Sequence, residues 1–138
     1  MKHIILITAY AEVEHLIEQL TIYDADSDFH VYIHRDKKHA TTALINKLAA
    51  HPSVKRVCSS YAINWGGRNQ LAAMIELCRY ALEDLSLAGN PPCFIHSISG
   101  TDILIHSLVN SRRSLRYIQK KVLWSTSRFP IRDGVRGD

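Results

Sequence analysis

The segment Asn64-Trp65-Gly66-Gly67 contains the residues of this chain best suited to holding a ligand. A tryptophan offers a flat aromatic face, and an exposed indole otherwise leaves a large apolar surface in water. Two adjacent glycines allow the backbone to adopt a positive φ or to approach another group closely. The combination predicts a loop that binds a planar ring, such as a nucleotide base. The alternative is a loop whose Trp65 side chain packs into the hydrophobic core.

Two further polar motifs directly follow apolar runs of the chain. Asp36 could accept hydrogen bonds from ribose hydroxyls or a base N–H, or it could only cap a turn. The turn from Ser99 to Asp102 could place the Asp102 carboxylate in a cleft, or it could be an Asp-stabilised turn without a ligand. Lys37 and Lys38 could face a diphosphate, but we interpret paired lysines in a loop as solvated.

These motifs are spread along an alternation of strand-like and helical patterns. Apolar runs rich in β-formers predict strands, and apolar residues at three- and four-residue spacing predict helices. The expected strands are 3–9, 29–34, 54–58 and 93–98, and the expected helices are 12–23, 41–50 and 68–87. This order favours an α/β fold with a mostly parallel sheet and helices on both faces. Ligands bind such sheets beyond the carboxyl ends of the strands, so the polar motifs should meet at one edge.

The longest expected helix, 68–87, repeats apolar residues in a broad stripe that we expect to face the core. The stripe consists of Leu71, Met74, Ile75, Cys78, Leu82 and Leu85. Either Thr41 or Thr42 could cap the preceding helix. The segment from Gly89 to Pro92 should end the longest one.

Signatures of several other enzyme classes are missing from the sequence. There is no G-x-x-x-x-G-K-[ST], no G-x-G-x-x-G and no D-x-D at a strand end, which disfavours a P-loop ATPase or a dinucleotide enzyme. We interpret the alternating Asp24, Asp26 and Asp28 as a solvated acidic loop. His30 and His34 would stand about 13 Å apart on one strand, too far to share a metal ion. The three cysteines form no C-x-x-C, so we expect reduced, partly buried thiols.

The net charge of +4 is concentrated at the end of the chain. Residues 111–138 hold the whole basic excess, whereas residues 1–110 are slightly acidic. This divides the chain into an α/β domain and a basic tail. The tail lacks the regular aromatic residues of a stacking platform, so nucleic-acid binding is not expected. No apolar run approaches the ~20 residues of a membrane span and the start is not a secretory signal, so we expect a cytoplasmic protein.

Four motifs in this order resemble the N-terminal half of the core-2/I-branching β-1,6-N-acetylglucosaminyltransferases, a family that includes the peptide O-xylosyltransferases. The motifs are Ala9-Tyr10, His34-Arg35-Asp36-Lys37-Lys38, Asn64-Trp65-Gly66-Gly67 and His96-Ser97-Ile98-Ser99-Gly100-Thr101-Asp102. The likeness covers residues 1–106 and fades beyond Ser111.

The resemblance implies a GT-A-like nucleotide-sugar fold and inverting transfer of GlcNAc or xylose from a UDP-sugar to a sugar or protein hydroxyl. It implies no metal, in agreement with the lack of D-x-D, and no cofactor besides the donor. By this likeness Asp36 and Trp65-Gly66 would lie near the uridine, while Ser99 and Asp102 would line the sugar end. The residues Tyr10 and Gly67 complete the expected donor site. Membrane association is implied by the family alone.

The chain also departs from the family. Ile103-Leu104-Ile105 stands where the family has a proline, and Arg35 stands where an apolar residue is common. Members are about twice as long, and their later half would supply the catalytic base, expected to be a Glu, so no catalytic residue is assigned. We therefore expect a truncated domain, 1–110, with an aberrant tail and no activity alone. The alternative is a non-catalytic remnant or interaction module whose basic tail contacts an acidic partner.

Overall fold

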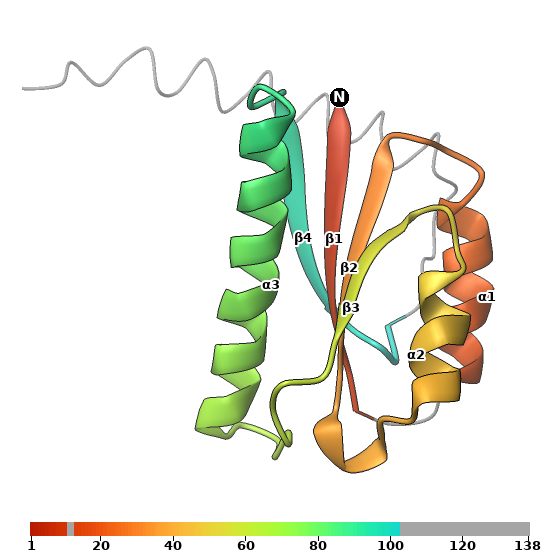
Figure 1. The fold of residues 1–138 in the computed structure, drawn as a ribbon, viewed down its shortest axis with the longest axis vertical. Coiled ribbons are helices and arrows are strands. Elements are labelled where there is room, and N and C mark those ends of the chain that lie inside the picture. The colour runs from red at the N-terminus through yellow and green to blue at the C-terminus, as the bar shows by residue number, and fades with distance from the viewer. Residues whose placement is uncertain (11–12, 103–138) are drawn as a thin grey trace, which may run out of the picture. The chain divides into compact units, whose positions relative to one another are not determined.

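The computed structural model describes residues 1–10 and 13–102. Its elements are β1 (Lys2–Ala9), α1 (Glu14–Tyr23), β2 (Phe29–Arg35), the short 3-10 helix η1 (Lys37–His39), α2 (Thr42–Ala49), β3 (Val54–Cys58), α3 (Arg68–Leu87) and β4 (Cys93–Ser99). The four strands are all parallel and lie in the order β3-β2-β1-β4 (Figure 1). The predicted parallel α/β fold is thereby confirmed, and it is Rossmann-like. The basic tail, 111–138, lies outside the described residues.

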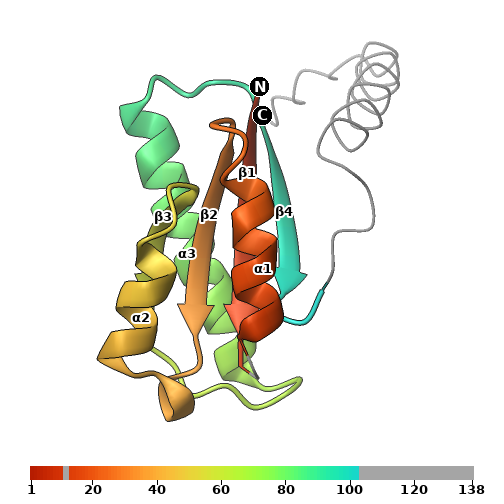
Figure 2. The ribbon, with the colours of Figure 1, turned by 90° about the vertical axis from the view of Figure 1, so that its right-hand side faces the viewer.

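The helices cover both faces of the sheet. α1 and α2 lie on one face, and α3 lies on the other (Figures 1 and 2). Ile4 and Leu6 of β1 pack with Leu77 and Leu85 of α3 in one buried cluster. β1 and β2 are buried along nearly their whole length, as expected for inner strands of a two-sided parallel sheet. This core fixes the carboxyl ends of the strands at one common edge.

Local capping residues set the ends of the helices. The Thr41 side chain accepts a hydrogen bond from the Leu44 N–H at 3.2 Å, so Thr41 is the cap of α2 and Thr42 is its first residue. α3 ends before Gly89, whose φ of 82° is in the left-handed region that glycine enters without a steric penalty. Asn90 follows with a φ of 54°, and its N–H donates to the Leu85 carbonyl at 2.8 Å. The start of α2 and the end of α3 thus agree with the sequence prediction.

The predicted inward stripe of α3 is wrong in part. Leu71, Ile75 and Leu82 are 63%, 59% and 56% exposed. The residues that face the sheet are spaced by four: Ala73, Leu77, Ala81 and Leu85. Met74 and Cys78 pack partly against this buried row. The two alanines let the helix backbone approach the strands, which a count of large apolar residues does not detect.

The interpretation of Asp24, Asp26 and Asp28 as a solvated acidic loop is also wrong in part. The Asp24 carboxylate accepts hydrogen bonds from the Ser53 N–H at 2.9 Å, the Ser53 hydroxyl at 2.5 Å and His51 Nδ1 at 2.6 Å. Partial burial works to raise the pKa of Asp24, but these hydrogen bonds together lower it. Asp24 therefore joins the end of α1 to the segment that leads into β3.

The structure agrees with the prediction of partly buried thiols for the three cysteines. Cys58, Cys78 and Cys93 are free and partly buried. Among the described residues, no helix has the length and apolar character needed to cross a bilayer.

Candidate functional site

A small pocket lies at the carboxyl edge of the sheet, where the sequence predicts a ligand site. Its cavity is about 110 Å³. The lining residues come from the ends of β1 and β2, from the loop between β3 and α3, and from the first turn of α3: Tyr10, Asp36, Lys38, His39, Ile63, Trp65 and Gln70. Three predicted residues, Tyr10, Asp36 and Trp65, are thus brought together. The cavity is smaller than the roughly 300–1,000 Å³ of typical ligand pockets, so it suits one ring of a larger ligand.

The Trp65 side chain is displayed at the surface and does not pack into the core. It is 87% exposed. The next residue, Gly66, has a φ of 69°, and its N–H donates to Gln70 Oε1 at 2.9 Å. A Cβ atom at Gly67 would lie 2.9 Å from the Asn64 carbonyl oxygen, which accepts the Gly67 N–H. The two glycines therefore serve a tight turn that presents the indole to solvent.

Asp36 is buried and holds the loop to the end of β2. Its Oδ1 accepts the Lys38 N–H at 3.1 Å and the Ile63 N–H at 3.0 Å. Burial works to raise the pKa of Asp36, but these two hydrogen bonds and the nearby charges of Lys38 and His39 lower it overall. The carboxylate is therefore ionised at neutral pH. It acts as the cap of η1 and as a loop anchor.

Lys38 is exposed, as we interpreted it, but its ammonium group is also hydrogen-bonded to the loop. Its Nζ donates to the Ile63 carbonyl at 2.6 Å and to Asn64 Oδ1 at 3.2 Å, and it lies 3.6 Å from Asp36 Oδ2. Lys37 is exposed. An ordered ammonium beside the exposed indole makes the pocket suitable for a ring that carries negative charge nearby.

The sequence analysis missed Lys38, His39 and Gln70 as pocket residues. A signal for the first two was available, because they follow Asp36 within one turn at the same strand end. Gln70 could have been noticed as an amide side chain three residues after the glycine that precedes a helix, the position from which a Glu or Gln side chain reaches back to the backbone before the helix.

The residues after β4 lie at the same edge but outside this pocket. The Ser99 N–H donates to Asp102 Oδ2 at 2.6 Å, and the Gly100 N–H donates to the Thr8 carbonyl at 2.9 Å. This is the Asp-stabilised turn that the sequence left as an alternative. Ser99 of β4 and His34 of β2 both pair with Thr8 of β1, so β1 lies between them. Two strand spacings place this turn roughly 10 Å from the end of β2.

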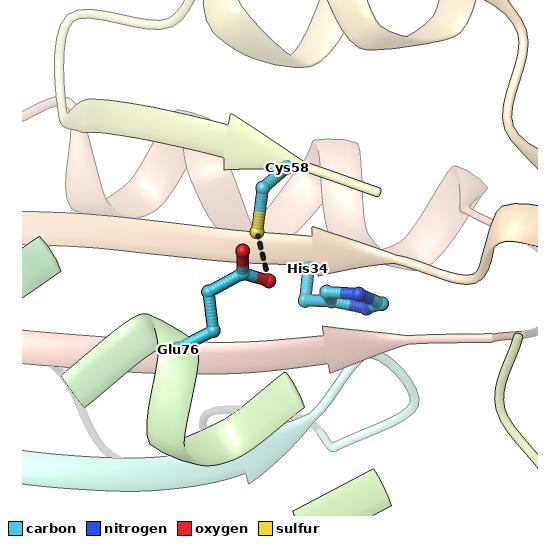
Figure 3. Close-up of side chains that lie close together, drawn as sticks. All are labelled: His34, Cys58 and Glu76. Carbon is cyan, nitrogen blue, oxygen red and sulfur yellow. Dashed lines mark hydrogen bonds between the residues drawn. The ribbon is translucent and has the colours of Figure 1, made fainter. Parts of the chain in front are cut away.

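A cluster that the sequence analysis did not foresee lies beneath the loop. His34, Cys58 and Glu76 each place one possible ligand atom within 4.8 Å of the others (Figure 3). Cys58 Sγ donates to Glu76 Oε2 at 3.6 Å. The hydroxyls of Ser60 and Tyr80 donate to Glu76 Oε1 at 2.8 and 3.1 Å. The cluster joins β2, β3 and α3, so only the fold brings it together.

Burial and hydrogen bonds set the protonation of the cluster. Burial first, and then the Glu76 charge, raise the pKa of Cys58 to about 12, so the thiol keeps its proton. Tyr61 N–H donates to His34 Nε2 at 3.1 Å, which leaves the ring proton of a neutral imidazole on Nδ1. We describe the cluster as a hydrogen-bonded network under the loop and assign no metal ion to it.

Comparisons of the chain with protein-family models, curated proteins and solved structures find no match. The family resemblance of the four motifs stays an expectation, and function is argued from the geometry of the pocket.

Proposed function

We propose that this chain is a nucleotide-binding domain of a glycosyltransferase-like protein and that its pocket receives the pyrimidine of a UDP-sugar. The observation that carries the proposal is the exposed indole of Trp65 beside a pocket at the carboxyl edge of a parallel sheet. Open α/β sheets bind ligands at this edge. An indole face held in water by a two-glycine turn suits base stacking, a contact that tolerates different bases.

The groups around the indole support a nucleotide over an uncharged ring compound. Lys38 and His39 line the pocket, and Lys38 Nζ is held by the loop carbonyl of Ile63. A cation placed in advance attracts phosphate without a further cost of ordering its side chain. In this proposal Trp65 and Tyr10 contact the base, and Lys38 faces the phosphates.

The GT-A form of the fold and the identity of the donor, UDP-GlcNAc or UDP-xylose, are part of the same proposal. The turn at Ser99 and Asp102 lies roughly 10 Å from the end of β2, across β1. In this proposal the diphosphate spans from the base at Trp65 across the end of β1 to a sugar at the turn.

Transfer needs more than this pocket supplies. An inverting reaction requires a base that deprotonates the acceptor hydroxyl and positive groups that stabilise departing UDP. Asp36 Oδ1 is occupied by two backbone N–H groups, and Asp102 Oδ2 by that of Ser99. We therefore assign neither as the base. We expect weak UDP binding and no sugar transfer by the described domain.

Calorimetric titration of the full chain with UDP and UDP-GlcNAc tests the proposal. We expect Trp65→Ala to weaken UDP binding about fivefold or more, because stacking on an aromatic ring stabilises a bound base by ~1–3 kcal/mol. Leu87→Ala is the control, since Leu87 is equally exposed but lies at the opposite end of α3. Equal affinities for the two variants would refute the pocket, and robust turnover would show that we have missed the base.

A second candidate is a non-catalytic interaction module, favoured by the apolar side chains on the outer face of α3 and on the terminal strand β4. Leu71, Ile75 and Leu82 of α3 and Ile95 of β4 are exposed. Apolar surface of this kind often marks a contact with another protein. This candidate predicts no heat with UDP in the same titration and concentration-dependent self-association in sedimentation.

A further inference from the structure

Beyond the strand pairing, the loop that carries Trp65 is held by one backbone hydrogen bond, from the Lys37 N–H to the Tyr61 carbonyl at 3.0 Å, and otherwise by side chains. The β2–β3 pairing ends at His34 and Cys58. Beyond it, the Tyr61 N–H donates to His34 Nε2 at 3.1 Å and the Ile63 N–H donates to Asp36 Oδ1 at 3.0 Å. Two side chains at the end of β2 thus accept backbone hydrogen bonds from the segment before the tryptophan. The position of the pocket wall depends on both acceptors.

Only one of the two acceptors can change its charge near neutral pH. His34 is fully buried, and its ring stacks on that of Tyr61 with centroids 5.8 Å apart. Nε2 accepts a hydrogen bond, so the proton of the neutral ring is on Nδ1. A protonated imidazole carries hydrogen on both nitrogens. It would therefore turn Nε2 into a donor facing the Tyr61 N–H, and the bond would be lost.

Burial and the neighbouring charges have opposite effects on the pKa of His34. Burial lowers the pKa of His34, while the negative charges of Glu76 and Asp36 work to raise it. Cys58 of β3 faces the same space as a neutral thiol. The effect of burial is the larger one, so the His34 ring is neutral at pH 7 and its hydrogen bond from the Tyr61 N–H is intact. Lowering the pH below about 6.5, the ordinary value for histidine, begins to favour states in which the ring is freed.

We propose that His34 is a positioning residue that makes the Trp65 loop pH-dependent: its neutral imidazole anchors the Tyr61 amide, and its protonation breaks that bond and loosens the chain at Tyr61. Tyr61 lies two residues before Ile63, which lines the pocket and stays bonded to Asp36 and Lys38. Ligand binding should then be strongest at neutral pH and weaken in acid. The loop part of this inference stands on geometry alone, and its ligand-binding part rests on the proposed function.

Nuclear magnetic resonance on the full chain tests the anchor directly. Nitrogen shifts report which ring nitrogen of His34 carries the proton, and hydrogen exchange reports the protection of the Tyr61 amide between about pH 7.5 and 5. His34→Gln retains an oxygen acceptor near the Nε2 position but does not titrate. His30→Gln is the matched control, because His30 lies on the same strand, also has a lowered pKa and stands at the far end of β2.

We expect an unprotonated Nε2 at neutral pH, and Tyr61 protection that falls as the pH drops below about 6.5, the ordinary pKa of a released histidine, by up to about tenfold per pH unit, the limit for one proton. The His30→Gln protein should behave in the same way, and the His34→Gln protein should lose the pH dependence. A protonated Nε2 at pH 7, or the same pH dependence in His34→Gln, would overturn the inference. UDP affinity, measured in parallel, should fall with Tyr61 protection. If protection behaves as expected and UDP binds at no pH, the proposed function fails and the loop anchor stands.

Discussion

Gly66 and Gly67 are both needed in the Trp65 loop, but for different physical reasons. Gly66 adopts a φ of 69°, and an added Cβ would meet no atom within 4 Å. Gly67 has an ordinary φ, but its Cβ would lie 2.9 Å from the backbone oxygen of Asn64. The first glycine therefore relieves backbone strain, and the second provides room for the chain to turn.

Alanine substitutions should separate these two requirements. We expect Gly66→Ala to lower the free energy of unfolding by about 1 kcal/mol, the cost of a left-handed alanine. Gly89→Ala is its control and should cost a similar amount, because Gly89 has a φ of 82° and equally open surroundings. Gly67→Ala should instead displace Asn64 and shift the resonance of the Trp65 indole. Denaturant unfolding and NMR spectra provide the two readouts, and an unchanged indole signal in Gly67→Ala would contradict the steric argument.

Residue types alone indicated the ring-binding part of the site but not its anchors. Trp65 beside two glycines left open whether the indole is displayed or packed into the core, and the structure displays it. The role of Asp36 depends on the Ile63 amide, 27 residues away in the chain, and that of Lys38 on the same segment. Such contacts are fixed by the path of a loop, which periodicity and spacing do not encode.

At the level of elements, α3 shows how a helix can be located correctly and oriented wrongly. Its bounds, Arg68–Leu87, agree with the prediction from the apolar pattern and the glycine that ends it. The buried row includes Ala73 and Ala81, whose small side chains allow close packing on the sheet. Leucines at Leu71 and Leu82 dominated the pattern but lie toward solvent. The pattern of large apolar residues therefore predicted the bounds of α3 but not which of its faces packs against the sheet.

Truncation of one leucine on each face of α3 tests this orientation. Leu77→Ala should lower the free energy of unfolding by ~2–5 kcal/mol, because it removes buried methyl groups and leaves a cavity in the Ile4–Leu6 cluster. Leu82→Ala, the matched control on the exposed face, should change it by less than about 0.5 kcal/mol. Urea denaturation measures both. Comparable losses would mean that the outer face is also packed.

At the scale of the whole domain, the histidines and carboxyl groups with shifted pKa values in the described part of the chain favour neutral over acidic pH. The pKa values of His30, His34 and His96 are lowered by burial. Hydrogen bonds lower the pKa of Asp24 and Glu76 despite the opposing effect of burial. In each case the unfolded chain binds more protons than the folded one over part of the acidic range. Folding stability must therefore decrease as the pH falls.

We expect this loss of stability in two stages. The first begins as the pH falls through about 6.5 and reflects the histidines, and the second begins near 4 as the unfolded carboxyl groups take up protons. Asp24→Asn should lower stability at neutral pH and reduce the second stage, because it removes the charge that Ser53 and His51 stabilise. The control is Glu83→Gln, since Glu83 is exposed on α3. Urea titrations across pH measure this, and stability that rises on acidification would contradict the assignment.

The architecture was predictable from the alternation of strand and helix patterns, because that order leaves few sensible arrangements of a parallel sheet. The position of Tyr10, Asp36 and Trp65 at one edge followed from the same rule. The network of His34, Cys58 and Glu76 did not, since it requires the register of two strands and the rotation of α3. The topology thus predicted where the site lies, whereas side-chain packing determines which further residues surround it.

The most direct test of the central claim is an NMR titration of the chain with UDP. Binding at the carboxyl edge predicts saturable shifts of the Trp65 indole, the Ile63 and Gly66 amides and the Gln70 side chain, with little change at Lys55 on the opposite edge. Shifts gathered elsewhere, or none at a UDP concentration well above millimolar, would contradict a pyrimidine site on Trp65.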